Sequence, residues 1–371
     1  MSEALLSPVR NCVTSGIVVT LEAQETALAA LEAYSRLLEA RGLAHRVEVR
    51  RQGAGLSARF LPDPAAPYLG RLQAMECRNA RELGRDDLSF EIFARMLTGP
   101  VAFTFPNLGE LEANLRMRLG IVEAARETEL TFNTAAADRP AAWWVEGEEG
   151  FAIAPEADLV TALVAATQPE DQGPRYAFSC YRASEYAMLT GMAAEMKASH
   201  PALYRRLEDC SRVSLIKSRR FHDTFLVEYG AEVGLPADYY VPGDRVWFRN
   251  PDEASADVPG YEGSWTIYLG GGQFANFWQR HRPYTLVDKC LELYHWRNGL
   301  TTGPDGQLAM DETRVAALVD ASRANPVEMQ EILTLMLRPR DPGGVYGDGG
   351  CLDRTREYPR CILPGTADMP L

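Results

Sequence analysis

Apolar and polar residues follow two different periods along the chain. Segments in which apolar residues recur every three or four positions are typical of helices with one buried face, and segments in which they alternate are typical of strands. The helical period predicts helices over residues 22–42, 87–96, 108–128, 181–197, 284–296 and 312–337. Alternation predicts strands over residues 11–21, 45–51, 56–61, 138–153, 212–217, 224–229, 245–249 and 265–269.

The order of these elements predicts a mixed α+β fold and not a series of βαβ units. The helix at 181–197 is followed by several strands that suit an antiparallel sheet. We expect a small α/β accessory unit at 1–85, a main domain at 86–338 and a flexible tail at 339–371. The tail is predicted to be flexible because it is rich in Gly, Pro and Asp and has little apolar periodicity.

Composition and charge exclude several classes of function. The net charge of -13 argues against nucleic acid and against an anionic membrane surface as main partners. No apolar run approaches the length of a transmembrane helix, and the N-terminus does not resemble a signal peptide, so we expect a cytoplasmic protein. The five histidines lack ligand-like spacing, and there is no glycine fingerprint for a nucleotide, so we expect neither a metal nor a cofactor. The sequence does not indicate the oligomeric state.

The most informative short segment ends in a cysteine. Tyr176-Ala177-Phe178-Ser179-Cys180 resembles a strand, and a helical pattern follows it at once. A helix N-terminus presents free N–H groups and a partial positive charge, and both favour a nucleophilic thiolate. The alternative is a small buried core cysteine, which is common for free thiols. The other six cysteines are scattered without a CxxC motif and are expected to be mostly free.

Several blocks of sequence resemble one known family in the same order. They are Leu115-Arg116-Met117-Arg118-Leu119-Gly120-Ile121-Val122-Glu123-Ala124-Ala125, Trp143-Trp144-Val145, the segment that ends in Cys180, Gly243-Asp244-Arg245-Val246-Trp247-Phe248-Arg249-Asn250-Pro251-Asp252 and Gly263-Ser264-Trp265-Thr266-Ile267-Tyr268-Leu269-Gly270. Over residues 88–338 the chain resembles the spore-coat protein-glutamine gamma-glutamyltransferases of bacilli, compact transglutaminases of papain-like, NlpC/P60-type fold. The resemblance implies a cysteine at a helix N-terminus packed on an antiparallel sheet, and it makes 86–338 the catalytic domain.

The same resemblance assigns Cys180 as the nucleophile, but this chain differs from the family at the positions that assist the nucleophile. Ser179 stands where the family has a glutamate, and Ser264 aligns with a second glutamate thought to act with the cysteine. Phe277, or a residue near it, occupies the position of a family histidine. The base that would assist Cys180 must therefore come from another residue.

Two residues are candidates for that base. Glu262 is the first, because a shift of two residues along a strand keeps a side chain on the same face as Ser264. His281 is the second, since it follows the region of the family histidine, although arginines flank it. Each has a simpler interpretation, a solvated loop carboxylate for Glu262 and an exposed basic turn for His281. Glu185 is five residues further along the helix and is rotated away from Cys180, so we do not expect it to assist the thiol. His222 and Asp223 do not form a catalytic pair either, because adjacent residues on a strand point to opposite faces.

Three functions remain open from the sequence. The first is acyl transfer by Cys180 on a glutamine side chain, which either cross-links proteins through lysine or deamidates them. The substrates would be proteins that carry glutamine and lysine side chains. The second is a catalytically impaired scaffold or binding protein of the same fold. The third is a cysteine peptidase or amidase that acts on another acyl substrate.

Overall fold

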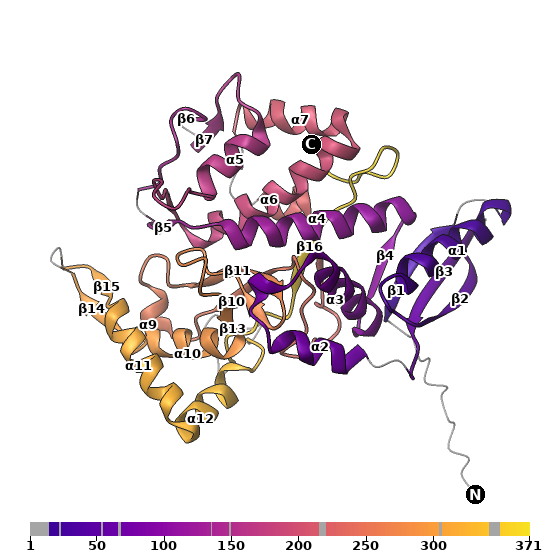
Figure 1. The fold of residues 1–371 in the computed structure, drawn as a ribbon. Helices are drawn as coiled ribbons and strands as arrows, with labels where there is room; N and C mark the ends of the chain where they lie inside the picture. The colour runs from indigo at the N-terminus through magenta and orange to yellow at the C-terminus, as the bar shows by residue number, and fades with distance from the viewer. Residues whose placement is uncertain are drawn as a thin grey trace, which may run out of the picture.

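The computed structural model describes residues 15–371 except 22–23, 53–54, 66–67, 135, 148–149, 215–219, 304–305 and 341–348 (Figure 1). The helices are α1 Gln24–Glu39, α2 Tyr68–Glu76, η1 Ala80–Glu82, α3 Arg85–Thr98, α4 Leu108–Glu127, α5 Leu159–Thr167, α6 Cys180–Ser199, α7 Pro201–Ser211, α8 Phe221–Phe225, α9 Glu253–Ala256, α10 Leu286–Trp296, α11 Glu312–Ala324 and α12 Pro326–Met336. The strands are β1 Gly16–Leu21, β2 His45–Gln52, β3 Gly55–Pro62, β4 Ala102–Phe105, β5 Thr131–Phe132, β6 Trp144–Gly147, β7 Gly150–Ile153, β8 Ala177–Phe178, β9 Leu226–Tyr229, β10 Arg245–Arg249, β11 Gly263–Gly270, β12 Gln273–Phe274, β13 Tyr284–Thr285, β14 Leu300–Thr302, β15 Leu308–Met310 and β16 Arg356–Pro359. The predicted mixed α+β class is confirmed.

The N-terminal region forms a small sheet of its own. Its strand order is β2-β3-β1-β4, with β1 antiparallel to β3 and parallel to β4. Ile17, Val19 and Phe60 are fully buried, because alternate residues of β1 and β3 face α1 and the rest of the core. The fourth strand comes from residues 102–105, so this sheet draws on sequence beyond residue 85. The division of the chain near residue 85 stays a prediction.

The central sheet has six strands in the order β13-β12-β11-β10-β16-β9, and all their pairings are antiparallel. In β10 and β11 the register places Phe248 opposite Ser264 and Trp247 opposite Trp265. Helices α4 and α6 pack on each other, and both contact β11. In Figure 1 the long α4 lies along one side of this sheet together with α6, with α5 and α7 beyond them, and α10, α11 and α12 lie at the other side. The sheet therefore links the helix that carries Cys180 to the α10 region.

Helices α4 and α6 cross closely because each has a glycine at the contact. A Cβ atom added to Gly191 would lie 2.4 Å from the backbone nitrogen of Ile121, which is too close for any side chain at this position. On the other helix, a Cβ at Gly120 would lie 3.2 Å from the Cα of Gly191. The two glycines therefore set the distance between the helices, and α4 fixes the position of α6.

The turn that leads into β10 depends on Gly243 and Asp244. Gly243 has a φ of 86°, and its Cα lies so close to α4 that a Cβ would come within 3.0 Å of the Arg118 Cα. Asp244 accepts a hydrogen bond from Arg118 at 2.8 Å, and both side chains are completely buried. The Gly-Asp sequence thus anchors the sheet to α4.

The structure corrects several predicted elements. The expected helix at 312–337 is two helices, because Pro326 has no N–H to donate and begins α12. The strand expected at 224–229 begins only at Leu226, after the short helix α8. Of the strand expected at 212–217, residues 212–213 form a turn, residue 214 is not in a strand, and 215–217 lie outside the described residues. The predictions did not include α2, α5 or α7.

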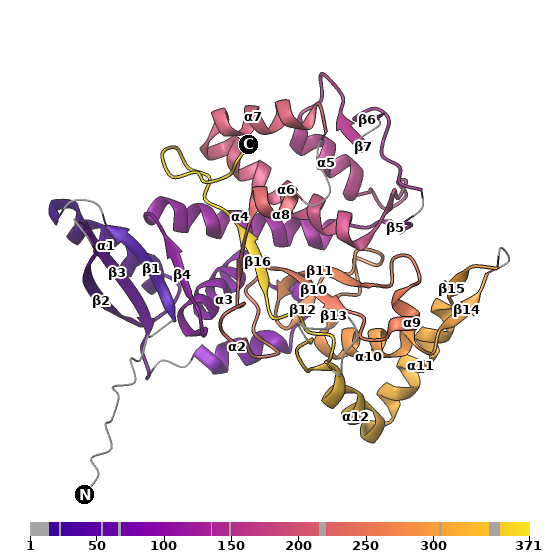
Figure 2. The same ribbon diagram turned by 180° about the vertical axis from the view of Figure 1, so that it is seen from behind.

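The expectation of a flexible tail is wrong for residues 349–371. Within this segment β16 lies between β10 and β9 in the central sheet. The view from behind shows β16 in yellow beside β10 (Figure 2). Arg356 is 2% exposed, and Ile362 is fully buried against the core. The pairing of β16 depends on strands that are distant in sequence, which the composition of the segment does not reveal. Among the described residues, no helix is both long and apolar enough to cross a membrane.

Candidate active site

The start of α6 follows from the sequence around Ser179. The side chain of Ser179 accepts a hydrogen bond from the Arg182 N–H at 3.3 Å, which makes Ser179 the N-cap and Cys180 the first helical residue. The preceding strand β8 pairs in parallel with β5 and buries Phe178. The predicted strand followed by a cysteine at a helix N-terminus is confirmed.

The sulfur of Cys180 lies against the edge of β11. Its Sγ is 3.8 Å from the carbonyl oxygen of Gly263, and the side chain is partly buried. A Cβ on Gly263 would lie 2.3 Å from Trp247 Nε1 and 2.6 Å from the Phe248 oxygen. Glycine is therefore required where β11 passes between Cys180 and β10.

A cavity of about 970 Å³ opens beside this sulfur. Its wall combines aromatic rings from several segments with charged side chains of α10 and α11. The lining residues include Phe132, Cys180, Tyr261, Ser264, Trp278, Tyr284, Lys289, Glu292, Trp296 and Glu312. A cavity of this size with a few convergent polar groups suits an extended side chain of a substrate.

Lys289 is the buried cation of this cavity. It lies on α10, which begins after the N-cap Thr285, and its side chain is 4% exposed. The ammonium group donates to Ser264 Oγ at 3.0 Å and to Glu292 Oε2 at 2.9 Å. It also lies 3.5 Å from the centre of the Tyr284 ring. These contacts hold the ammonium group in one place on the cavity wall.

The environment of Cys180 has opposing effects on its ionisation. Burial raises the pKa of the Cys180 thiol, because a thiolate is poorly solvated there. Hydrogen bonds from the backbone N–H groups of Trp265 and Tyr181 and the charge of Lys289 lower this pKa, while the negative charge of Glu262 adds to the rise. Burial has the largest effect, and the pKa lies above its usual value.

The structure brings two of the four predicted site residues together. Cys180 and Ser264 both line the cavity. Glu262 is exposed just before β11 begins, and its carboxylate accepts the Gly260 N–H at 3.3 Å. His281 is also exposed, and its Nε2 lies 3.5 Å from Arg280 Nε. The catalytic roles of all four residues stay predictions.

Sequence reasoning missed Lys289. A lysine within a helix is normally exposed, and the pattern of residues 284–296 gave no reason to treat this one differently. Its burial depends on the approach of α10 to β11, two segments that the chain order alone does not place together.

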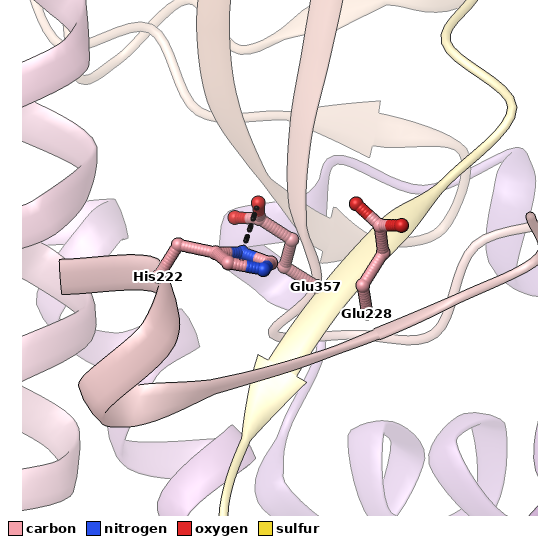
Figure 3. Close-up of side chains that lie close together, drawn as sticks. All are labelled: His222, Glu228 and Glu357. Atoms are coloured by element: carbon pink, nitrogen blue, oxygen red, sulfur yellow. Dashed lines mark hydrogen bonds and ion pairs between the residues drawn. The ribbon is translucent and has the colours of Figure 1, made fainter. Parts of the chain in front are cut away.

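A second cluster has the composition of a metal site. Among the described residues, His222, Glu228 and Glu357 form one group whose potential ligand atoms all lie within 4.8 Å of one another. Figure 3 shows the His222 imidazole directed toward Glu357, with Glu228 nearby. Glu357 already accepts hydrogen bonds from His222 at 2.9 Å and from Arg245 at 2.8 Å. Because Glu357 already pairs with both His222 and Arg245, we interpret the cluster as an ion-pair network. Arg245 in turn lies 3.9 Å from the Trp265 ring centre.

This network predicts a pH dependence of stability. The hydrogen bond to Glu357 raises the pKa of His222, and Glu357 stays ionised because His222 and Arg245 lower its pKa against the effect of burial. A raised histidine pKa contributes stability that is complete below the unfolded value of about 6.5 and is lost as pH rises through the folded value. Urea unfolding should therefore show the wild type losing stability relative to His222→Gln between pH 6 and pH 8. A difference that stays constant or grows over this range would contradict the interpretation.

One family model matches most of this chain, and two known proteins are similar to parts of it. The model of the family "Protein-glutamine gamma-glutamyltransferase" matches residues 71–346. A protein-glutamine gamma-glutamyltransferase of Halalkalibacterium halodurans is 24% identical over 193 residues, which cover 49% of this chain and 61% of that relative. A solved transglutaminase from Geobacillus stearothermophilus, without its C-terminal extension, matches with a TM-score of 0.41 and 21% identity over 58% of this chain and 98% of its own. Because the family model spans most of the sequence, the chain belongs to the protein-glutamine gamma-glutamyltransferase family.

Proposed function

We propose that this protein transfers the acyl group of a protein glutamine side chain through a thioester on Cys180. The observation that carries the proposal is the position of Cys180, at the N-terminus of α6 and at the wall of a large cavity in a chain of this family. A helix N-terminus supports a thiolate, and a cavity admits the glutamine side chain. We further propose that α6 and the central sheet form a papain-like core within the domain 86–338.

The reaction proceeds in two steps. The thiolate of Cys180 attacks the carboxamide carbon, and the carbon–nitrogen bond breaks. The leaving nitrogen takes up one proton and departs as ammonia. A lysine amine then attacks the thioester, loses a proton and forms an isopeptide bond, while the sulfur leaves. Water in place of the amine yields glutamate. The N–H groups of Tyr181 and Trp265, which lie beside the sulfur, are the candidate donors to the oxyanion.

A second function is a scaffold without turnover, and the ionisation of Cys180 favours it. Burial raises the pKa of the Cys180 thiol, so less of the nucleophilic thiolate forms at neutral pH. The alignment to the family also agrees with this alternative, since Ser264 stands at the position of the auxiliary glutamate and Phe277, or a residue near it, at that of the histidine. This alternative predicts a protein that keeps the cavity but does not consume glutamine.

The wild-type protein distinguishes these functions in one assay. We would incubate it with a glutamine-rich protein and a fluorescent primary amine, and measure amine incorporation and ammonia release together. The proposal predicts both signals, and ammonia without incorporation would indicate a deamidase. Cleavage of the substrate without incorporation would favour a peptidase. If a panel of glutamine-containing proteins yields neither product, the scaffold is favoured over the enzyme.

A further inference from the structure

The nucleophile of this cavity has no histidine beside it. All five histidines lie within the described residues, and none lines the cavity. His200 lies 2.6 Å from the Ile362 oxygen, His222 pairs with Glu357, and His295 bonds Ser322 at 2.8 Å. Any cation that assists the thiolate must therefore come from a lysine or an arginine.

The charged groups around Cys180 leave one suitable cation. Arg323, on α11, is paired with Asp288 at 2.6 Å and Asp320 at 3.0 Å. Arg182, on the same helix as Cys180, is paired with Glu185 at 2.7 Å. The remaining charged groups on or beside the cavity are Glu262, Arg282, Lys289, Glu292 and Glu312. Of these, Glu262 and Arg282 are exposed, and Glu312 accepts the Tyr261 hydroxyl at 2.6 Å.

Lys289 differs from the other cations in both burial and contacts. Its ammonium group donates to Ser264 Oγ, and Ser264 lies between the two residues of β11 whose backbone contacts the Cys180 sulfur. Glu292 and the Tyr284 ring hold it from the other sides. A buried charge acts more strongly on a nearby ion than an exposed one, because less water screens the interaction.

We propose that Lys289 is a positioning residue for the reaction of Cys180, supplying the fixed positive charge that stabilises its thiolate and holding the Ser264 hydroxyl at the cavity wall. This inference rests on the proposed role of Cys180 as the nucleophile. Glu292 moderates the effect, because its carboxylate neutralises part of the lysine charge. Lys289 thus takes the part that an imidazolium cation plays beside other cysteine nucleophiles.

Alkylation of Cys180 as a function of pH tests this proposal without any substrate. We would treat each protein with iodoacetamide from pH 6 to pH 10, and measure the modified Cys180 peptide by mass spectrometry. Lys289→Met should raise the apparent pKa of the thiol by about one unit, which is about a tenfold slower reaction at neutral pH. Lys289→Arg should largely restore the wild-type profile. Glu292→Gln should shift the profile the other way, toward lower pH.

The controls separate this proposal from the proposed function. Lys197→Met removes an exposed lysine at the far end of α6 and should leave the profile unchanged. If Lys289→Met does not fold, as circular dichroism would show, the downward shift of Glu292→Gln still decides the matter. Unchanged profiles for Lys289→Met or Glu292→Gln, or shifts in the same direction, would overturn the role of Lys289. Opposite shifts in a protein that incorporates no amine would support Lys289 and reject the transferase.

Discussion

Replacing Cys180 by alanine is expected to reduce amine incorporation by about 10⁴-fold or more, to the background of the assay. Removal of the nucleophile in a covalent mechanism eliminates the intermediate itself, and losses of this size follow in other enzymes of this kind. The fold should persist, since the side chain is small and partly exposed, and alanine is tolerated at the first position of a helix. Amine incorporation and ammonia release should disappear together.

The exposed thiol of Cys77 provides the matched control. Cys77→Ala removes a cysteine of the same chain that lies on the surface, and it should keep full activity. Thermal unfolding of both variants would verify that the loss in Cys180→Ala is chemical. Activity that survives in Cys180→Ala, or that disappears in Cys77→Ala, would show that the nucleophile is assigned wrongly.

The second large effect concerns stability. Arg118→Met is expected to lower the free energy of unfolding by about 3–5 kcal/mol, because it leaves a buried charge without its partner. Arg118 donates to Asp244 at 2.8 Å, to Asn114 at 3.0 Å and to the Pro242 oxygen at 3.1 Å, and its side chain is completely buried. Asp244 keeps the hydrogen bond from Val241 N–H but loses its counter-charge. Urea unfolding measures the change.

Two further variants identify the cause of that loss. Asp244→Asn in the Arg118→Met background should recover part of the stability, since the unpaired carboxylate is then gone. Glu123→Gln, on the same helix, breaks an exposed pair with Arg85 and should cost at most about 1 kcal/mol. If Arg118→Met costs no more than Glu123→Gln, the buried pair does not anchor the sheet to α4.

Local sequence predicted the parts of the fold that depend on neighbouring residues. The start of α6 follows from the strand-like segment that ends at Cys180 and the helical pattern after it. The helix at 108–128 follows from its apolar face, which is buried as expected. The helix break at Pro326 could have been predicted, because a proline inside a helical pattern ends the helix. The apolar period continues on both sides of Pro326 and therefore predicts one helix instead of two.

Features that depend on distant segments were not predictable in this way. β16 joins the central sheet through β9 and β10, more than 100 residues away, and its short sequence shows no clear alternation. The burial of Lys289 requires α10 to approach Ser264 on β11. Charged residues are mostly exposed in folded proteins, so the sequence alone does not predict the burial of Lys289 or of Arg118.

The most direct test of the central claim is the mass of the acyl-enzyme. A glutamine-containing peptide is mixed with the wild-type protein without an amine acceptor, and the reaction is quenched with acid. The masses of the intact protein and of its proteolytic peptides are then measured by mass spectrometry. We predict an adduct equal to the peptide minus ammonia, located on the peptide that contains Cys180 and absent from Cys180→Ala. An adduct on another residue, or amine incorporation by a protein in which Cys180 has been blocked by alkylation, would contradict the account.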